Sequence, residues 1–433
     1  MPTRGPHLAR FTNWGGSASC APTSRAAPGS EDEVCALVKG AAGGRVKVVG
    51  GAHSWSDCAM TDHTLVSLEA MNRVVRVDKQ RGQVTVEGGM RLHALNEALA
   101  TEGLALPIVG SIADQTVAGL VATGTHGSSL QHRNLSAHVK AITLVDGRGE
   151  VVEIDANDAR LPGARLALGA LGIVTRVTLM VEPAFTVVEE MEPVTFEAAM
   201  AALPTLARDV EYAKLWWFPH TDRALLFRGR RADVVPTFST AFRSFDTHVV
   251  NGVVFRGLLG LGATFPSWIP ALNRTVALTY GSPRRVVGRS DQVLTVAMPP
   301  RHRESEWAVP LDAAVAMLRG ARQLVEEQGH RVNFILEARF VPSDDTWMSP
   351  AYGRDVVQVG AYSGNPGGCA AWFGAFAALA RSLEGRPHWG KEAEFTPDDV
   401  GRWYPQAGAF RDLARSLDPE GLFRNGFTER LGV

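Results

Sequence analysis

The sequence predicts an α+β protein of more than one domain. Its 433 residues are enough for two or three domains of roughly 100–200 residues each. Short strand and helix signals alternate as far as Glu182 and Pro183, whereas aromatic residues and arginines become denser after this point. We therefore expect a domain boundary near Pro183.

The composition is that of a globular protein and excludes several function classes. Hydrophobic residues make up 45% of the chain and charged residues 21%, which argues against long disordered segments. The formal net charge is −1, so the protein has no broad basic field for nucleic acid. The 44 glycines follow no strict period, which excludes a collagen-like chain and predicts many tight turns.

Periodicity and turn residues define the elements of the first domain. Ser30 and Glu33 form a capping-box pattern that predicts a helix over residues 31–39. Leu92, Leu95 and Leu99 have helical spacing and predict a helix over 91–102. A period of two predicts the strands at 45–49, 64–68, 73–77, 83–87, 139–145, 151–154 and 173–181.

Fewer elements can be predicted after Pro183. We expect helices over 310–327, 370–383 and 408–417, a strand over 332–340, and long polar loops over 228–236 and 299–306. The stretch from Gly257 to Leu272 has no charge, but it contains Pro266 and Pro270 and is shorter than the roughly 18–20 residues of a membrane span. It predicts a buried or interfacial segment, and leaves room for peripheral contact with a membrane.

The cysteines and the N-terminus predict a cytoplasmic protein. Cys20, Cys35, Cys58 and Cys369 form no C-x-x-C pair, so zinc-ribbon and thioredoxin-type sites are unsupported. Free thiols in a reducing compartment are favoured over disulfides. The first sixteen residues have no apolar signal core.

Two glycine-rich loops follow apolar strands and are candidates for binding an anion. They span 48–56 and 110–119, and the second continues into 123–128. Consecutive small residues let backbone N–H groups approach a phosphate closely. Neither loop matches the P-loop or the G-x-G-x-x-G fingerprint, so an ATPase or a Rossmann dehydrogenase is unsupported. Each loop taken alone is more simply interpreted as a turn.

Three sets of side chains could carry chemistry. His53 follows the first loop, although a lone histidine is more often packed than reactive. His126, His132 and His138 recur every six residues, a spacing that does not align on a helix face, so we predict no metal site. Glu337 and Arg339 are two apart on a predicted strand and therefore share one face of the sheet, among apolar neighbours that indicate burial.

Several ordered motifs, together covering nearly the whole chain, resemble one known family. They are 11–14 (FTNW), 49–57, 110–119, 122–127, 169–175, 336–340 (LEARF), 386–391 (RPHWGK) and 417–425. On these motifs the chain resembles the aldonolactone oxidoreductases of the vanillyl-alcohol-oxidase flavoprotein superfamily, most closely the gulonolactone oxidases. The resemblance implies a two-subdomain FAD-binding domain over 1–182, an α+β cap domain over 183–395 that carries the substrate site, and a segment over 396–433 that returns to the FAD domain.

The resemblance also implies a role for individual residues. His53 takes the place of the histidine that bonds covalently to the flavin 8α-methyl carbon, and Lys391, Arg339 and Glu337 take the catalytic places. Ser111, Glu337, Arg339, His388 and Lys391 fall on the substrate side. The remaining FAD contacts fall on Val49, Gly50, Gly51, Ala52, Ser54, Gly110, Ser111, Gln115, Ala118, Gly119, Thr123, Gly124, Thr125, His126, Gly127, Gly172, Ile173, Val174 and Asn425.

The chemistry of these residue types fits oxidation of an alcohol by a flavin. A fixed cation stabilises the negative charge that hydride transfer places on the flavin, and Arg339 suits this because it stays protonated. Lys391 could stabilise the same charge or, when desolvated, accept a proton. We expect an aldono-1,4-lactone oxidase that makes hydrogen peroxide. The alternatives are an alditol oxidase, a dehydrogenase with another electron acceptor, and a flavin- or sugar-binding protein without turnover, against which the complete set of reactive residues argues.

Gly110 predicts which electron acceptor is used. Related dehydrogenases that react poorly with oxygen carry a larger residue at what resembles this position. A missing methyl group would leave a gap beside the flavin ring that dioxygen enters, since close packing would otherwise close it. The alternative is that Gly110 is needed for a backbone conformation with positive φ.

Overall fold

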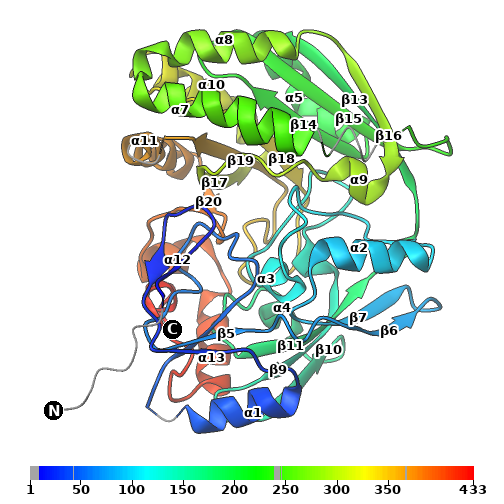
Figure 1. Cartoon of the computed structure of the whole chain (residues 1–433), viewed down its shortest axis with the longest axis vertical. Coiled ribbons are helices and arrows are strands. Elements are labelled where there is room, and N and C mark those ends of the chain that lie inside the picture. Colours follow the sequence, from blue (N-terminus) through cyan, green and yellow to red (C-terminus); the bar gives the residue numbers. More distant parts are fainter. Residues whose placement is uncertain (1–8, 42, 238–243, 245, 366–367) are drawn as a thin grey trace.

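The structure is a computed structural model that describes residues 9–41, 43–237, 244, 246–365 and 368–433. Figure 1 shows two parts, a lower one that contains α1 and α13 and an upper one built on a large sheet. The chain passes from the lower to the upper part after β12 (Glu182–Pro183) and returns after β20 (Arg386–Pro387). This arrangement places the large sheet of the upper part above the first domain.

Two sheets frame the first domain. The parallel sheet has the order β3 (Ser24–Ala26), β5 (Thr64–Ser67), β4 (Val46–Val49). The antiparallel sheet has the order β10 (Val151–Asp155), β9 (Val139–Val145), β11 (Ile173–Met180), β7 (Gln83–Glu87), β6 (Val74–Asp78). Two small pairs are β1 (Phe11–Thr12) with β2 (Ser19–Cys20), and β12 with β8 (Leu104–Ala105). The helices are α1 (Glu31–Gly40), α2 (Leu92–Thr101), α3 (Val117–Ala122), η1 (Leu135–His138) and α4 (Leu161–Ala164).

Local sequence signals explain the first helix. The Ser30 side chain accepts a hydrogen bond from the backbone N–H of Glu33 at 3.2 Å, and the Glu33 carboxylate accepts one from the N–H of Gly29 at 2.8 Å. These bonds satisfy two donors near the N-terminus of the helix that would otherwise be unpaired. The predicted helix is confirmed, and so are the strands of this domain within one or two residues.

The second domain is an eight-stranded antiparallel sheet between two layers of helices. Its order is β16 (Arg284–Arg289), β13 (Thr186–Thr195), β15 (Arg223–Arg231), β14 (Tyr212–Trp217), β18 (Leu336–Val341), β19 (Val356–Ser363), β17 (Arg303–Pro310), β20. One face packs against α5 (Phe196–Asp209), α10 (Ala314–Glu326, after η4, Leu311–Ala313) and α11 (Cys369–Ser382). The other elements are η2 (Asp246–Phe255), α7 (Arg256–Thr264), η3 (Pro266–Trp268), α8 (Ile269–Thr279) and α9 (Ser290–Leu294).

Strand periodicity assigns the two faces of this sheet. Leu215 and Trp217 on β14, with Leu336 and Ala338 on β18, belong to the core under α5, α10 and α11. Since side chains alternate along a strand, the residues between them point to the opposite face. On β18 this is where Glu337 and Arg339 lie, and it is the face turned toward the first domain.

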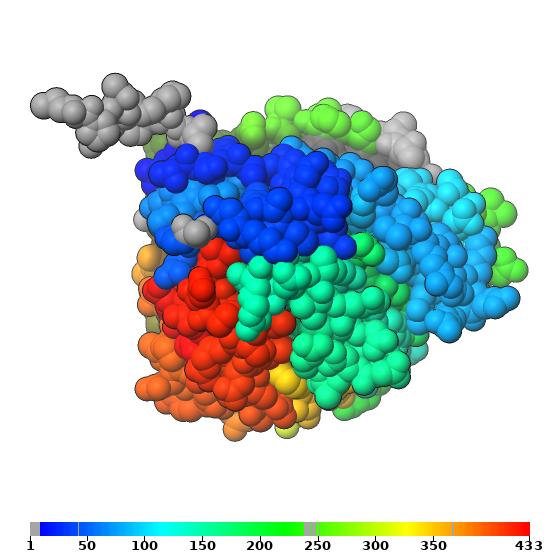
Figure 2. All heavy atoms as spheres, turned by 90° about the horizontal axis from the view of Figure 1, so that it is seen from below, coloured from blue at the N-terminus to red at the C-terminus, as the bar shows by residue number. Residues whose placement is uncertain are grey.

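The C-terminal segment packs onto the first domain. It contains α12 (Pro397–Trp403), α13 (Ala407–Leu417) and α14 (Gly426–Leu431), and Phe410 and Phe427 lie in the same core as the leucines of α2. Figure 2 shows these residues, in red, beside the N-terminal residues in blue and the segment around residue 150 in green. Trp389 and Phe395 belong to this core too, so the contact with the first domain begins before residue 396.

Two predicted loops are wrong in part, since each is a loop over only some of its expected residues. The expected loop over 228–236 begins inside β15, and the second half of the loop expected over 299–306 is the start of β17. Both strands look polar in sequence because their charged side chains pair across strands or in the interior, as Arg228 does with Glu192 at 2.5 Å. The uncharged stretch 257–272 forms most of a helical hairpin, whose outer side is exposed rather than buried.

Buried histidines predict a loss of stability in acid. Burial lowers the pKa of His138 to about 4 and that of His388 to about 3, whereas an unfolded histidine titrates near pH 6.5. Below pH 6.5 the unfolded chain therefore binds protons that the folded chain does not. Each histidine should lower the free energy of unfolding by about 1.4 kcal/mol per pH unit down to about pH 4. Asp344 opposes part of this, because burial raises its pKa to about 6.

The contribution of His138 can be isolated with His138→Gln, which lies far in sequence from the candidate catalytic residues. Urea unfolding at pH 7, 6 and 5 should show that the variant loses stability less steeply than the wild type, by about 1 kcal/mol per pH unit averaged over this range, because an unfolded histidine is only partly protonated near pH 6.5. Equal slopes for the two proteins would contradict the assignment.

Candidate active site

A long cleft crosses the first domain between its two sheets. It encloses about 1220 Å³, counting the part open to solvent. Its walls come from segments far apart in the sequence, namely 46–54, 67–69, 88–91, 115–123 and 167–174, together with Phe423 from the C-terminal segment. Twelve of the predicted cofactor contacts line it: Val49, Gly50, Gly51, Ala52, His53, Ser54, Gln115, Ala118, Gly119, Thr123, Gly172 and Val174.

Glycine residues allow the backbone segments around this cleft to pack closely against their neighbours. A dinucleotide site requires such a close approach of the backbone. A Cβ atom on Gly50 would lie 2.0 Å from Thr116 Oγ1, and one on Gly89 would lie 1.8 Å from the carbonyl oxygen of Leu68. Gly172 has φ of +144° and stands against the carbonyl of Val145. A larger residue would have to displace the Thr116 side chain at position 50 and backbone at positions 89 and 172. The residues present therefore fit an FAD, whose pyrophosphate the backbone N–H groups of these loops would bind.

His53 lies in the wall of this cleft. Its ring stands 5.7 Å from the ring of Trp14, and the preceding residue, Ala52, has φ of +57°. The N–H of Trp14 donates to the carbonyl of Ala52 at 2.8 Å and fixes this unusual backbone. Burial lowers the pKa of His53, so its imidazole is neutral near pH 7 and carries a free lone pair. A neutral imidazole is the form that can act as a nucleophile.

The C-terminal loop before residue 396 contacts the loop that carries His53. The N–H of Trp55 donates to the carbonyl of Gly390 at 2.7 Å. Lys391 Nζ lies 4.2 Å from the centre of the Trp55 ring and 2.5 Å from a carboxylate oxygen of Glu304. This contact places a cation beside the histidine loop, even though the two are more than 300 residues apart in sequence.

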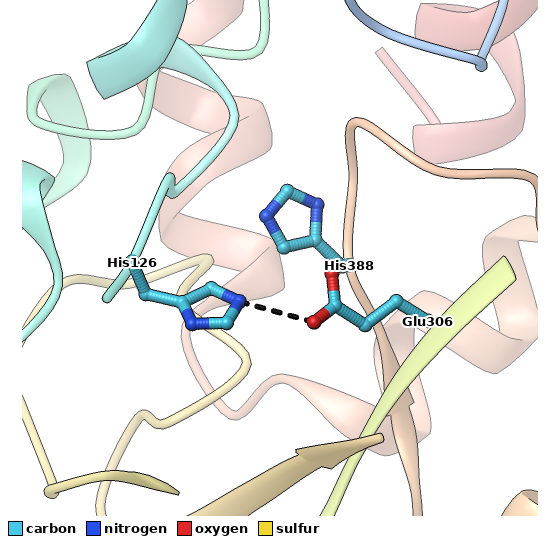
Figure 3. A group of neighbouring side chains, drawn as sticks. All are labelled: His126, Glu306 and His388. Atoms are coloured by element: carbon cyan, nitrogen blue, oxygen red, sulfur yellow. Dashed lines mark ion pairs between the residues drawn. The ribbon is translucent and has the colours of Figure 1, made fainter. Parts of the chain in front are cut away.

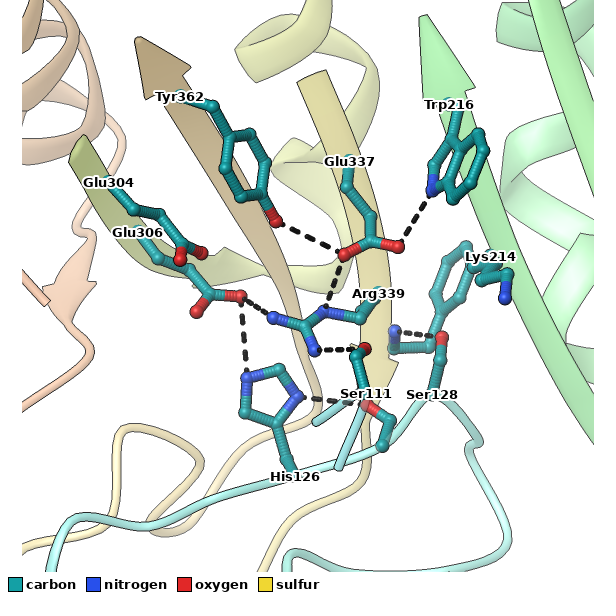
Figure 4. A network of polar contacts seen from close by, with 12 residues as sticks. Ser111, His126, Ser128, Lys214, Trp216, Glu304, Glu306, Glu337, Arg339 and Tyr362 are labelled. Carbon is teal, nitrogen blue, oxygen red and sulfur yellow. Dashed lines mark hydrogen bonds and ion pairs between the residues drawn. The ribbon is translucent and has the colours of Figure 1, made fainter. Parts of the chain in front are cut away.

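A buried polar network covers the face of the cap sheet that looks toward the first domain (Figure 4). Arg339 Nη2 lies 2.5 Å from Glu306 Oε1, and Arg339 Nε lies 3.3 Å from Glu337 Oε2. Arg339 Nη1 donates to Ser111 Oγ at 3.2 Å, which joins the cap to the second glycine-rich loop. The carboxylate of Glu337 accepts hydrogen bonds from Trp216 Nε1 at 2.7 Å and from the hydroxyl of Tyr362 at 3.2 Å.

Glu304 and Glu306 are site residues that the sequence did not reveal. Both are essentially inaccessible to solvent, at 2% and 0% exposure. Burial alone would raise their pKa values, but the charge of Lys391 on Glu304 and that of Arg339 on Glu306 lower the pKa of each. Glu304 Oε1 and Glu306 Oε2 have no hydrogen-bond partner among the described residues. The site thus offers two ionised carboxylate oxygens that can accept hydrogen bonds from a ligand.

One part of the network has the donor atoms of a metal site. His126, Glu306 and His388 place one ligand atom each within 4.8 Å of one another. Figure 3 shows the side chains of His126 and Glu306 facing each other, and His126 Nε2 lies 3.4 Å from Glu306 Oε1. Glu306, however, already pairs with Arg339, which adds positive charge where a metal ion would stand. His388 Nδ1 accepts the N–H of Gly390 at 3.0 Å, so that lone pair is occupied. The arrangement favours a polar substrate pocket over a metal site.

Close packing explains why position 110 is a glycine. Its φ is not positive, so the backbone explanation fails. A Cβ atom there would lie 2.5 Å from Cγ2 of Thr125, which shows that the space beside Gly110 is filled by the Thr125 methyl group. The expected open gap for dioxygen is therefore not present at this position.

The remaining predicted residues lie outside the cleft wall. Gly124 packs on Leu166, Gly127 packs on Ile108, and Ile173 is fully buried in a core below the parallel sheet. Asn425 Nδ2 donates to the carbonyls of Asp57, Cys58 and Met60 at 3.0–3.1 Å, while its Oδ1 caps α14. Asn425 thus ties the C-terminal segment to the loop after His53 and does not face the cleft.

Comparisons with known proteins agree with this architecture. A model for FAD-binding domains matches residues 22–155, and a model for D-arabinono-1,4-lactone oxidases matches residues 177–431, which is more than half of the chain. The chain belongs to the D-arabinono-1,4-lactone oxidase family. A "solvent-stable cholesterol oxidase" superposes with a TM-score of 0.83 over 100% of both chains at 18% identity, which shows a shared fold.

Two relatives match almost the full length of the chain. The L-gulonolactone oxidase of Scyliorhinus torazame is 32% identical over 97% of this chain and 98% of its own. The L-gulono-1,4-lactone dehydrogenase of Mycobacterium tuberculosis (strain ATCC 25618 / H37Rv) is 32% identical over the same shares. Membership of this family makes the protein an FAD-dependent oxidoreductase that acts on CH–OH groups.

Proposed function

We propose that this protein is a cytoplasmic oxidase of an aldono-1,4-lactone that holds FAD covalently through His53 and passes electrons to dioxygen, with hydrogen peroxide as the second product. The observation that carries the substrate class is the buried network of Glu304, Glu306, Glu337, Arg339 and Lys391 beside the FAD cleft. This number of ionised groups matches a substrate rich in hydroxyl groups, because each hydroxyl of a bound substrate needs its own hydrogen-bond partner. An apolar ligand such as a sterol would leave Glu304 Oε1 and Glu306 Oε2 without a hydrogen-bond partner.

The residues of this network have different roles in the oxidation of an alcohol. FAD, when bound, supplies the acceptor for the hydride that leaves the carbon. Arg339 and Lys391 place positive charge next to the reacting centre, which stabilises negative charge developing there. The unpaired oxygens of Glu304 and Glu306 accept hydrogen bonds from substrate hydroxyls, and one of them can take the hydroxyl proton. Because Glu304 holds Lys391 in a close ion pair, we assign Lys391 to charge stabilisation and not to proton abstraction.

Peroxide formation on a panel of substrates tests this function. The panel contains gulono-, galactono- and arabinono-1,4-lactones and the corresponding sugar alcohols. Oxygen consumption with equimolar peroxide on a lactone supports the proposal, whereas turnover of sugar alcohols alone identifies an alditol oxidase.

A dehydrogenase is the second candidate, since one full-length relative carries that name. The filled space beside Gly110 removes one argument for an oxidase. Anaerobic bleaching of the flavin by a lactone, followed by slow recovery in air and fast recovery with an artificial acceptor, would identify the dehydrogenase.

Covalent attachment predicts that the flavin stays with the denatured protein. Wild-type protein precipitated with acid should remain yellow and fluoresce in a denaturing gel, and His53→Ala should release its flavin into the supernatant. His93→Ala is the matched control, because His93 is exposed on α2 near the same cleft. A colourless pellet from flavin-loaded wild type would contradict the attachment without contradicting the lactone chemistry.

A further inference from the structure

Two buried histidines at the boundary between the domains hold their ring hydrogens in opposite positions. His126 Nδ1 lies 2.9 Å from the carbonyl oxygen of Gly127, which can only accept, so this Nδ1 carries a hydrogen. His388 Nδ1 accepts the backbone N–H of Gly390 at 3.0 Å and therefore carries none. Burial lowers the pKa of His388 to about 3, which keeps its ring neutral near pH 7 with the hydrogen on Nε2. A neutral His126 thus offers an acceptor at Nε2, whereas His388 offers a donor at Nε2.

Glu306 completes a small cluster with these two rings. One polar atom of each side chain lies within 4.8 Å of the other two, and Figure 3 shows the three side chains converging. His126 is 2% exposed and Glu306 is fully buried. Even so, His126 Nε2 and Glu306 Oε2 have no hydrogen-bond partner among the described residues. Buried polar atoms without a partner are rare in folded proteins, and a polar ligand would satisfy both of these.

A neutral hydroxyl group matches this cluster better than a charged group does. A hydroxyl both donates and accepts hydrogen bonds, so it can donate to His126 Nε2 and accept from His388 Nε2. An ionised carboxylate or phosphate would be repelled by the carboxylate of Glu306. A cation would be repelled by Arg339 and Lys391, which lie 2.5 Å and 4.0 Å from Glu306. The cluster therefore fits one hydroxyl group of an uncharged substrate.

We propose that His126 is the general base of the reaction, which takes the proton of the hydroxyl group that is oxidised, and that His388 binds the oxygen of the same group. This inference rests on the proposed lactone oxidation and adds a residue to its mechanism. As the O–H bond breaks, the proton bonds to His126 Nε2, and the electron pair left on oxygen forms the carbonyl double bond. The C–H bond of the same carbon breaks, and the hydride leaves with that electron pair for the bound FAD.

The carboxylates of the network are weaker candidates for this proton. Burial alone would raise the pKa of Glu306, but the charge of Arg339 lowers it. Lys391 has the same effect on the buried Glu304. A carboxylate with a lowered pKa is a weak base toward an alcohol. Glu306 instead faces His126 across 3.4 Å, where its charge stabilises the imidazolium that forms when the proton arrives.

The backbone that follows His126 is fixed to the cap. Ser128 Oγ accepts the N–H of Phe340 at 3.0 Å, and the N–H of Ser129 donates to the carbonyl of Phe340 at 2.9 Å. These bonds join the loop to β18, the strand that carries Arg339 (Figure 4). His126 is thereby positioned in advance, and a general base must be held within hydrogen-bond reach of the proton that it takes.

Anaerobic stopped-flow mixing of the flavin-loaded protein with L-gulono-1,4-lactone tests the proposal. The limiting rate of flavin bleaching should fall about a hundredfold or more in His126→Gln, because a positioned base commonly contributes that much. The FAD content and the rate of reoxidation by dioxygen should stay near those of the wild type. His138→Gln is the matched control and should bleach normally, because His138 Nε2 also has no hydrogen-bond partner among the described residues.

Chemical rescue separates a base from a structural residue. His126→Ala should lose the rate as His126→Gln does, and free imidazole should restore at least about tenfold of it in proportion to its concentration. His388→Phe should raise the lactone concentration that gives half-maximal bleaching about tenfold, because one hydrogen bond to the substrate oxygen is lost.

Each other outcome has a defined meaning. Bleaching at the wild-type rate in both His126 variants would overturn the proposal. A lower FAD content in them would assign His126 to flavin binding, and a lost rate that imidazole does not restore would assign it to positioning, so either result would overturn its role as a base. Wild-type flavin that sugar alcohols bleach and lactones do not would contradict the lactone function alone, and the same variants are then compared with the sugar alcohol.

Discussion

Replacing Lys391 by methionine should slow the reduction of the bound flavin by substrate about a hundredfold while leaving the FAD content near that of the wild type. Lys391 is the cation that lies next to the His53 loop, over the ring of Trp55. Loss of one preorganised charge at a reacting centre commonly costs on the order of 10²–10³ in rate. Stopped-flow bleaching under anaerobic conditions measures this step directly and separates it from reoxidation.

Two further variants show whether the effect comes from catalysis or from folding. Lys391→Met leaves Glu304 buried without its cation, which should cost about 3–5 kcal/mol of stability. Lys391→Met with Glu304→Gln removes both charges and should restore most of the stability without restoring the rate. Lys214 provides a matched control, because it is buried to the same degree, pairs with Glu189 at 3.3 Å and lies over the ring of Phe227. If Lys391→Met reduces flavin as fast as Lys214→Met, Lys391 has no role in the reaction.

The parts of the site that sequence reasoning found have local signals. Glu337 and Arg339 are two residues apart among apolar neighbours, and a strand period alone places both side chains on one buried face. His53 and the glycines around it form a contiguous motif, and the structure places them in one cleft wall. Ser30 likewise fixes the start of its helix through a bond to the nearby N–H of Glu33. Such signals need no knowledge of distant contacts.

The parts that sequence reasoning missed depend on contacts between distant segments. Residues 303–306 read Arg-Glu-Ser-Glu, which has no apolar alternation and resembles a loop. They form a buried strand only because β19 and β20 pair with its two edges, and because Arg339 and Lys391 compensate the two carboxylates. The exposure of one face of α7 and α8 is missed for the opposite reason. An uncharged sequence indicates burial, but only one side of this helical hairpin packs on the rest of the cap, and its other side is exposed to solvent.

Glu306 is the missed residue with the largest expected effect. It is fully buried and stands between Arg339 at 2.5 Å, His126 at 3.4 Å and Lys391 at 4.0 Å. Glu306→Gln keeps the shape of the side chain but removes the charge that fixes the guanidinium of Arg339. We expect kcat to fall and KM for the lactone to rise, each by about tenfold or more, because both the stabilising charge and an acceptor for substrate hydroxyls are lost.

A double-mutant cycle decides whether Glu306 acts through Arg339. Glu306→Gln alone should cost about 3 kcal/mol of stability, since it leaves a buried guanidinium with only Glu337 as its charged partner. Adding Arg339→Met should recover stability but lower activity further, with a coupling free energy of about 1–3 kcal/mol. Glu211→Gln, which breaks the less buried pair with Arg231, should change neither kcat nor KM. A coupling near zero, or an unchanged KM in Glu306→Gln, would mean that Glu306 only fills the space beside β18 and that Arg339 is positioned by Glu337 and Ser111.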